Sequence, residues 1–382
     1  PAGGARRGAR PAPLQAPPGA PGSPWHGAAW AAVAYARPRQ VLPGPHEAIA
    51  SPHSDEVVAQ LTQVVQVLAA GRAPSELAPY LAGATLHALP KPGGDLRPIA
   101  VGETFRRLVA KCLCAAVKEP AHDRLWPLQV GVAVPLGAEA AVHTARQWVQ
   151  RNAGRREKVF LKLDFQNAFN AMDRPSLLRQ VRLHLPGLAP WAEWCYDRHS
   201  RLLFQGTALA SEAGVQQGDP LGPLLFALAL QPALEAARSG APGQQPELCL
   251  AFLDDVCLAG ECGQVAASLA RLSAAARQLG LQLNPEKCEL TTCGGSDHSV
   301  SLQLFPAGFK LNQSGELSLL GAPIGPPAYC DCEAGREEQA VAGCWENWRT
   351  PRQASSSSGT APPSARSFTL CEQRPRIPSV LL

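Results

Sequence analysis

Two adjacent aspartates, Asp254 and Asp255, interrupt an apolar stretch that runs from Leu248 to Ala259. Neighbouring buried carboxylates repel each other and lose hydration, so both stay ionised only where a cation or strong hydrogen bonds compensate them. Magnesium is the natural cation for a site made of oxygen ligands. The pair therefore predicts a metal site, although the same pattern also suits an ordinary β-hairpin with Asp-Asp at its turn.

A third carboxylate, Asp164, makes the metal site the better interpretation. Asp164 follows the apolar run 159–163, which predicts a buried strand. Carboxylates that end strands from distant parts of the chain converge when those strands pair, and two-metal phosphoryl-transfer sites are built in this way. We therefore expect Asp164 to lie against Asp254 and Asp255 and to share divalent ions with them.

The elements that would position these residues mix strands and helices. Short strands are predicted over 85–89 and 96–101, joined by a Gly-rich turn, and single strands over 202–209, 289–292 and 317–320. Helices are predicted over 103–117, 138–150, 175–184, 191–200, 221–237 and 264–279. Because strands and helices do not alternate regularly, the pattern favours an α+β domain with an antiparallel sheet.

Composition bounds the class of protein. The chain has 382 residues, of which 46% are apolar, enough for one large domain or two modest ones. Residues 1–50 and 351–366 are of low complexity and predict disordered ends. No apolar stretch is long enough to span a membrane and no signal-peptide pattern opens the chain, so we expect a soluble intracellular protein without membrane contact.

The net charge and the cysteine spacing do not by themselves indicate a function. A net charge of +4 permits nucleic-acid binding without requiring it. Two basic groups could follow a phosphate backbone or simply form solvated faces: Arg106, Arg107 and Lys111, and then Arg151, Arg155, Arg156 and Lys158. The 12 cysteines contain no Cys-x-x-Cys pair and predict buried thiols; a cluster of Cys330, Cys332 and Cys344 would lack a fourth metal ligand.

Six short motifs occur in a characteristic order. They are 89–99 (Leu-Pro-Lys-Pro-Gly-Gly-Asp-Leu-Arg-Pro-Ile), 164–169 (Asp-Phe-Gln-Asn-Ala-Phe), 217–221 (Gln-Gly-Asp-Pro-Leu), 252–255 (Phe-Leu-Asp-Asp), 280–287 (Gly-Leu-Gln-Leu-Asn-Pro-Glu-Lys) and 320–321 (Leu-Gly). Over about residues 75–325 this series resembles the palm and fingers of reverse transcriptases, most of all those of retroelements without long terminal repeats.

The resemblance implies a right-hand polymerase fold with an antiparallel palm sheet. It divides the chain into a disordered segment (1–50), fingers with the start of the palm (51–157), the palm (158–325) and a low-complexity tail or remnant thumb (326–382). A helical thumb is expected to be missing or truncated, because few residues follow Gly321. The box around Asp254 also departs from the family, with Phe252 where Tyr is commoner and Leu253 where a small residue is common.

The implied activity is that of an RNA-directed DNA polymerase. Its partners would be an RNA template, a DNA or RNA primer and deoxynucleoside triphosphates (dNTPs), and its cofactor two Mg²⁺ ions, with Mn²⁺ as a substitute. Asp164 and Asp254 would bridge the ions. Asp255 would be the third acidic member, although adjacent strand residues such as Asp254 and Asp255 point to opposite faces.

The resemblance also assigns substrate contacts, each with a structural alternative. Phe169 would lie beneath the incoming sugar and exclude a 2′-hydroxyl, or it packs in the core. Lys91 and Arg97 would bind the triphosphate, or they are exposed hairpin charges. Gln217 and Gly218 would approach a base pair or nucleotide, or Gly218 only interrupts the chain before a helix. Lys287 would lie near the pyrophosphate, or it is a solvated lysine.

Two other functions remain open at this point. A decayed or repurposed retroelement copy would bind nucleic acid or protein without polymerising. An RNA-dependent RNA polymerase would share the palm, although Phe169 and the 217–220 motif weigh against it.

Overall fold

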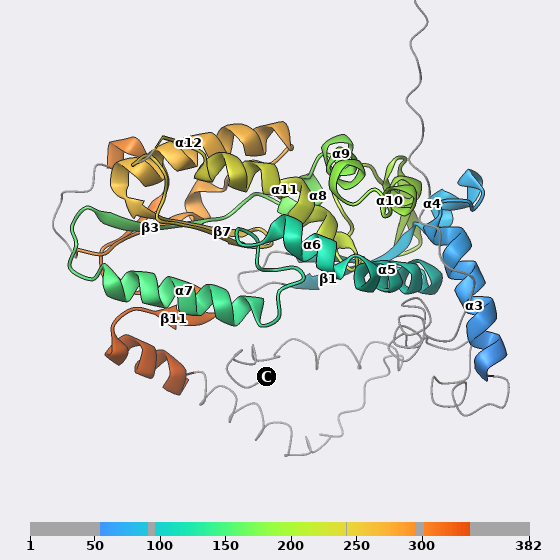
Figure 1. Cartoon of the computed structure of the whole chain (residues 1–382), viewed down its shortest axis with the longest axis horizontal. Coiled ribbons are helices and arrows are strands. Elements are labelled where there is room, and N and C mark those ends of the chain that lie inside the picture. The colour runs from blue at the N-terminus through green and yellow to red at the C-terminus, as the bar shows by residue number, and fades with distance from the viewer. Residues whose placement is uncertain (1–53, 91–95, 242, 295–301, 337–382) are drawn as a thin grey trace, which may run out of the picture.

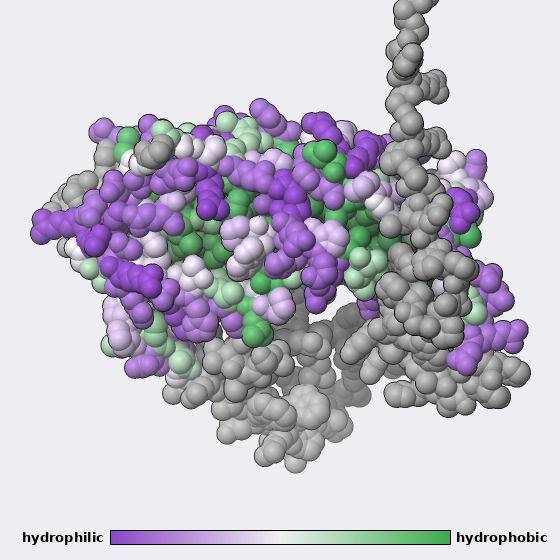
Figure 2. Space-filling view, viewed as in Figure 1, coloured by the Kyte–Doolittle hydropathy of each residue, from purple (hydrophilic) through white to green (hydrophobic). Residues whose placement is uncertain are grey.

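The computed structural model describes residues 54–90, 96–241, 243–294 and 302–336. They form the predicted α+β architecture, with helices packed on two main sheets (Figure 1). The low-complexity ends, 1–50 and 351–366, lie outside the described residues, as does any thumb beyond residue 336. Figure 2 shows hydrophilic residues over most of the described surface in this view, with hydrophobic residues visible in the middle of the face.

The larger sheet, called the palm sheet below, contains both acidic stretches. Its strands in spatial order are β6 (Leu248–Phe252), β7 (Asp255–Glu261), β3 (Lys158–Leu163), β8 (Glu289–Thr292) and β9 (Lys310–Asn312). Neighbours are antiparallel except β8 and β9, which are parallel. The predicted antiparallel palm sheet is thus confirmed for four strands, and a parallel strand is added at one edge.

The central strands of the palm sheet are buried on both faces. Val159 and Leu161 of β3 pack into the main core, whereas Phe160 between them packs with residues on the opposite face. A strand covered on both sides reads as a continuous apolar run, which is how the sequence of β3 reads. The covering elements are α11 (Gly222–Arg238) and α12 (Cys262–Gln278) on one face, and α7 (Gly137–Arg151), β10 (Leu317–Leu319) and β11 (Ala322–Ile324) on the other (Figure 1).

A second sheet, called the fingers sheet below, has the order β2 (Leu96–Gly102), β1 (Ala84–Pro90), β4 (Ser200–Phe204) and β5 (Thr207–Ser211). The predicted hairpin is confirmed as the antiparallel pair β1 and β2. Its connection, residues 91–95, lies outside the described residues, and with it Lys91. Because β4 pairs in parallel with β1, this sheet joins segments that precede and follow β3 in the chain.

The single strand expected over 202–209 is wrong. The structure has two antiparallel strands there, β4 and β5, with Phe204 paired to Thr207. Both intervening residues have positive φ, 48° at Gln205 and 83° at Gly206, as in a type I′ turn. The helix expected over 191–200 is also shorter, because α10 (Ala189–Tyr196) ends before β4 begins.

The other helices are α3 (Ser54–Ala69), α4 (Ala78–Leu81), α5 (Thr104–Ala116), α6 (Lys118–Leu125), α8 (Ala168–Ala171) and α9 (Arg174–His184). Helix α9 begins where the sequence predicts, because Asp173 caps it by accepting the Ser176 N–H (2.8 Å) and Pro175 suits a first turn. Within the ranges that the structure describes, none of the helices combines the length and the apolar character that crossing a bilayer requires.

Candidate active site

The three acidic residues lie at one end of the two central palm strands. Leu163, the last residue of β3, pairs with Val256 of β7. Asp164 follows Leu163, and Asp255 precedes Val256 as the first residue of β7. The predicted pairing of the two acidic strands is therefore confirmed. Asp164 and Asp254 are half-buried and Asp255 is exposed, so the group lies where the sheet meets solvent.

The backbone of Asp164 is fixed by the segment that precedes β8. Its carbonyl accepts the Asn284 N–H (2.8 Å), and its N–H lies 3.4 Å from the sulfur of Cys288. Burial raises the pKa of the Cys288 thiol, so this sulfur remains neutral beside the acidic group. Lys287 adjoins Cys288 and is exposed, which puts a lysine in the segment that supports Asp164.

The β6–β7 hairpin closes through a strained residue. Phe252 pairs with Asp255, so Leu253 and Asp254 form a two-residue turn. Leu253 has a φ of 57°, and a bulky residue in that region costs about 1–3 kcal/mol unless its surroundings impose it. The buried side chain of Gln129 contacts the Leu253 backbone. No sequence pattern indicated this role for Gln129, because it lies in an irregular stretch between the helices predicted over 103–117 and 138–150.

The oxygen donors of the acidic group suit a divalent cation. Among the residues that the structure describes, no three Asp, Glu, His or Cys side chains are gathered closely enough to hold an ion alone. Magnesium does not require such a cage, because it commonly binds one or two carboxylates together with water and substrate phosphates. Asp164 and one carboxylate of the turn fit that mode. Of the suggested tail cluster, Cys344 lies outside the described residues.

Phe169 packs against the core with one face. Its ring stacks on Phe226 of α11, with centroids 4.5 Å apart and planes 13° apart. Its carbonyl accepts the Val215 N–H (2.8 Å), which ties α8 to the loop before α11. The core-packing role is therefore confirmed. The ring is only partly buried, so it keeps some surface for a further contact.

Gln217 and Gly218 lie against the fingers sheet. The Gln217 carbonyl accepts the Ala100 N–H of β2 (2.6 Å). Gly218 has a φ of +123°, and a Cβ there would lie 2.3 Å from the Ala100 carbonyl oxygen. The glycine is thus required by close approach to a strand, a reason that the sequence did not suggest. The contact also brings the loop to β2, whose residue Arg97 is exposed.

Replacing Gly218 by Ala is expected to destabilise the fold by clearly more than the about 1–3 kcal/mol of an unfavourable φ alone, because the new methyl group meets backbone. Gly154→Ala is the matched control. Gly154 also has a positive φ, +79°, but a Cβ there would meet nothing within 4 Å. Urea denaturation of both variants measures the difference; equal losses would contradict the steric explanation.

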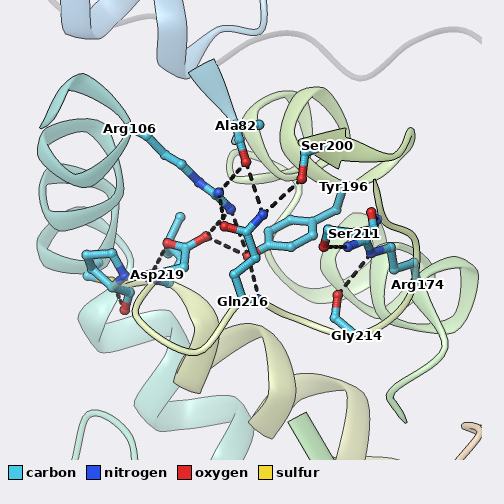
Figure 3. Close-up of polar contacts among 12 residues, drawn as sticks. Ala82, Arg106, Arg174, Tyr196, Ser200, Ser211, Gly214, Gln216 and Asp219 are labelled. Carbon is cyan, nitrogen blue, oxygen red and sulfur yellow. Dashed lines mark hydrogen bonds and ion pairs between the residues drawn. The ribbon is translucent and has the colours of Figure 1, made fainter. Parts of the chain in front are cut away.

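A buried polar network, called the Arg106 network below, holds the loop before α11 (Figure 3). Arg106 of α5 is 1% exposed and forms an ion pair with Asp219 (2.8 Å). The Tyr196 hydroxyl donates to the same carboxylate (2.6 Å), and Gln216 donates to Ser200 (2.9 Å). Burial by itself would lower the pKa of Arg106, but the Asp219 carboxylate, together with Tyr196 and Cys195, more than offsets this effect, so the pKa is raised and the guanidinium stays charged.

A second arginine completes the Arg106 network. Arg174 donates to the Gly214 carbonyl (2.9 Å) and to the Ser211 carbonyl (2.7 Å). The Tyr196 ring lies between the two guanidinium groups, 5.4 Å from that of Arg106 and 5.3 Å from that of Arg174 (Figure 3). The loop that carries Gln217 and Gly218 is therefore fixed at both ends by buried arginines.

Neither alternative offered for Arg106, a phosphate contact or a solvated face, is correct, because its charge is buried against Asp219. The same holds for Lys158, which is 5% exposed and lies 3.4 Å from Glu261. A sequence signal existed for Arg106: it shares helical spacing with the buried residues Val109, Ala110 and Leu113. Arg151 and Arg155 are exposed as expected.

Comparison with known protein families gives a match over most of the described chain. The family model for reverse transcriptase (RNA-dependent DNA polymerase) matches residues 89–324. This range includes all three acidic residues and Phe169, Gln217, Gly218 and Lys287.

Individual relatives are retroelement proteins of greater length. The chain is 26% identical over 230 residues to the retrotransposable element SLACS 132 kDa protein of Trypanosoma brucei gambiense, a match that covers 58% of this chain and 18% of that protein. It is 31% identical over 138 residues to the Pol polyprotein from type-1 retrotransposable element R2 of Nasonia vitripennis, covering 33% of this chain and 13% of that protein. The chain thus spans less than a fifth of either relative.

Among solved structures, apo telomerase from Candida tropicalis, truncated from its C-terminal domain, is similar with a TM-score of 0.46 and 14% identity. That match covers 65% of this chain and 54% of the telomerase chain.

Proposed function

Because this chain belongs to the reverse transcriptase family, we propose that it extends the 3′-hydroxyl of a DNA or RNA primer with dNTPs, directed by an RNA template. The observation that supports this most is the location of Asp164 at the shared end of β3 and β7, beside the β6–β7 turn that carries Asp254. Two-metal nucleotidyl transfer needs metal ligands that converge on one place, and the direct pairing of β3 with β7 brings these carboxylates to the same end of the sheet.

In the proposed site, Asp164 and Asp254 would hold two Mg²⁺ ions, or Mn²⁺ in their place, and Asp255 would be the third acidic member. Bound divalent ions lower the pKa of an attacking hydroxyl and stabilise the charge of the leaving pyrophosphate. The protein's part is to keep the carboxylates in place. Three features support that part: the pairing of β3 with β7, the Asn284 contact to Asp164, and the fixed turn at Leu253.

We assign the incoming nucleotide to a position where residues of both sheets can contact it. Arg97, and Lys91 at the hairpin connection, would bind its triphosphate, and Lys287 would act near the pyrophosphate. The exposure of Arg97 and Lys287 supports these roles, since a buried, paired cation could not reach a substrate. Gln217 and Gly218 would face the base pair from a loop that the Arg106 network holds rigid.

In the proposed polymerase, residues 51–157 form the fingers and the start of the palm, and residues 158–325 form the palm. The two parts are interlocked, since β4 of the palm range extends the fingers sheet through its pairing with β1.

Primer extension on an RNA template, with dNTPs and ribonucleoside triphosphates supplied separately, tests this function. The expected result is addition of the complementary deoxynucleotide, dependent on Mg²⁺. Extension that prefers ribonucleotides would contradict the proposal and favour an RNA-dependent RNA polymerase. Absence of extension by a folded chain would also contradict it and favour a repurposed copy that only binds nucleic acid or protein.

Phe169→Val is expected to weaken discrimination against ribonucleotides by about tenfold or more, because removal of the ring opens space for a 2′-hydroxyl. Phe160→Leu is the control: Phe160 is 1% exposed and packs on the opposite face of the palm sheet, so its truncation should lower stability but leave the selectivity unchanged. The measurement is the ratio of kcat/KM for the two nucleotide types. An unaltered ratio in Phe169→Val would leave Phe169 with its packing role only.

A further inference from the structure

One buried side chain outside the hairpin holds the turn that carries Asp254. Gln129 is 0% exposed. Its Oε1 accepts the Leu253 N–H (2.7 Å), and its Nε2 donates to the Leu253 carbonyl (3.1 Å). We propose that Gln129 is a positioning residue, which fixes the backbone of the carboxylate turn for metal binding and catalysis. Its catalytic consequence rests on the polymerase function proposed above.

The turn needs such support because its own sequence disfavours its conformation. Of its two central residues, Leu253 has positive φ, 57°, and Asp254 does not. That pattern matches a type II′ turn, in which glycine is the favoured first residue. A leucine keeps this conformation only where the surrounding structure imposes it. The Gln129 amide supplies the constraint, since it occupies both backbone polar groups of Leu253.

Gln129 can act in this way because its own backbone is fixed. The Val130 N–H donates to the Ala251 carbonyl (2.8 Å), and the Ala251 N–H donates to the Leu128 carbonyl (2.7 Å). Gln129 therefore forms a parallel β-bridge with Ala251, close to the end of β6 that leads into the turn. Its Oε1 also accepts the Gly131 N–H (3.0 Å), which holds the side chain in one orientation.

Gly131 shows how closely this segment approaches the turn. A Cβ at Gly131 would lie 2.8 Å from the Leu253 nitrogen and 2.9 Å from its Cγ. Gly131 thus leaves room for Leu253, and the Gln129 amide binds the backbone of the same residue. Two neighbouring positions, distant in sequence from the hairpin, are shaped to receive Leu253.

The first test uses the metal-free protein and does not depend on activity. In Gln129→Met, hydrogen exchange of the Leu253 amide is expected to accelerate about tenfold or more, because the amide loses its acceptor. Gln231→Met is the matched control. Gln231 is 2% exposed and donates to the carbonyls of Arg124 (3.3 Å) and Leu125 (3.4 Å), away from the turn. This variant should leave the exchange of Leu253 unchanged.

The second test is functional. Gln129→Met should raise the Mg²⁺ concentration for half-maximal primer extension about 10- to 100-fold, the usual cost of losing a residue that orients a metal ligand. The KM for dNTPs should stay within about twofold. Adding Leu253→Gly should restore part of the lost Mg²⁺ affinity, because glycine adopts positive φ without strain. Should Gln129→Met fail to fold, Gln129→Asn, which keeps the amide but shortens its reach, replaces it.

Unchanged Leu253 exchange in a folded Gln129 variant would overturn the proposal, as would an equal rise in Mg²⁺ requirement in Gln231→Met. If the wild-type chain extends no primer but the exchange result holds, the proposed function fails while the control of the turn by Gln129 stands. The two hypotheses are therefore separable.

Discussion

Asp164→Asn is expected to reduce primer extension on the order of a thousandfold, because amide oxygen cannot replace the charge that a carboxylate contributes to a divalent site. Asp254→Asn should have an effect of the same order. The fold should persist in both. The backbone contacts of Asp164 with Asn284 and Cys288 do not involve its carboxylate, and the pairing of Phe252 with Asp255 closes the turn through the main chain.

Asp123→Asn provides the control for a lost negative charge. The Asp123 side chain is 82% exposed on α6, and its contact to His122 is long (3.5 Å). The measurement is the rate of single-nucleotide extension by each of the three variants. A thermal unfolding curve of each variant shows that it is folded. A folded Asp164→Asn or Asp254→Asn variant that extends primers at the rate of Asp123→Asn would refute the assignment of these carboxylates.

The second large effect concerns stability. Arg106→Met is expected to lower the free energy of unfolding by about 3–5 kcal/mol, because it leaves the Asp219 carboxylate buried without its cation. Asp219→Asn should cost a similar amount by leaving Arg106 uncompensated. In the double variant the losses should fall short of their sum, since the two side chains act as one pair.

Arg182→Met is the matched control, because Arg182 and Glu193 form a pair of similar length (2.6 Å) whose side chains are 52% and 39% exposed. Its loss should cost about 0–1 kcal/mol. Because the pKa of Arg106 is raised, its guanidinium stays charged throughout the ordinary pH range, and the stability that this charge contributes is lost only when strongly alkaline pH removes the proton. Equal costs for Arg106→Met and Arg182→Met would contradict the importance of burial.

The strands that carry the acidic residues could be predicted from the sequence because their burial leaves a direct pattern. The run 159–163 is apolar at nearly every position, as a strand covered on both faces must be. The helix α11 likewise follows from an apolar stretch with proline in its first turn. By contrast, the β4–β5 turn places a glutamine at positive φ, where Asn or Asp would have given a signal.

The residues that fix the candidate site were missed because their roles depend on partners far away in the chain. Arg106 and Asp219 are 113 positions apart, and Gln129 is 124 positions from Leu253. A charged side chain on a helix gives no indication of its partner, and a glutamine in an irregular segment gives none either. Only the helical spacing of Arg106 with buried neighbours could have shown that its charge is turned inward.

The most direct measurement is the binding of Mn²⁺, followed by electron paramagnetic resonance, to the wild-type chain with primer, template and an unreactive dNTP analogue. Shared coordination predicts that wild-type protein binds Mn²⁺ tightly, whereas Asp164→Asn and Asp254→Asn each weaken that binding by about tenfold or more while Asp123→Asn does not. Wild-type Mn²⁺ affinity in either folded Asn variant would contradict the claim that β3 and the β6–β7 turn hold the metal together.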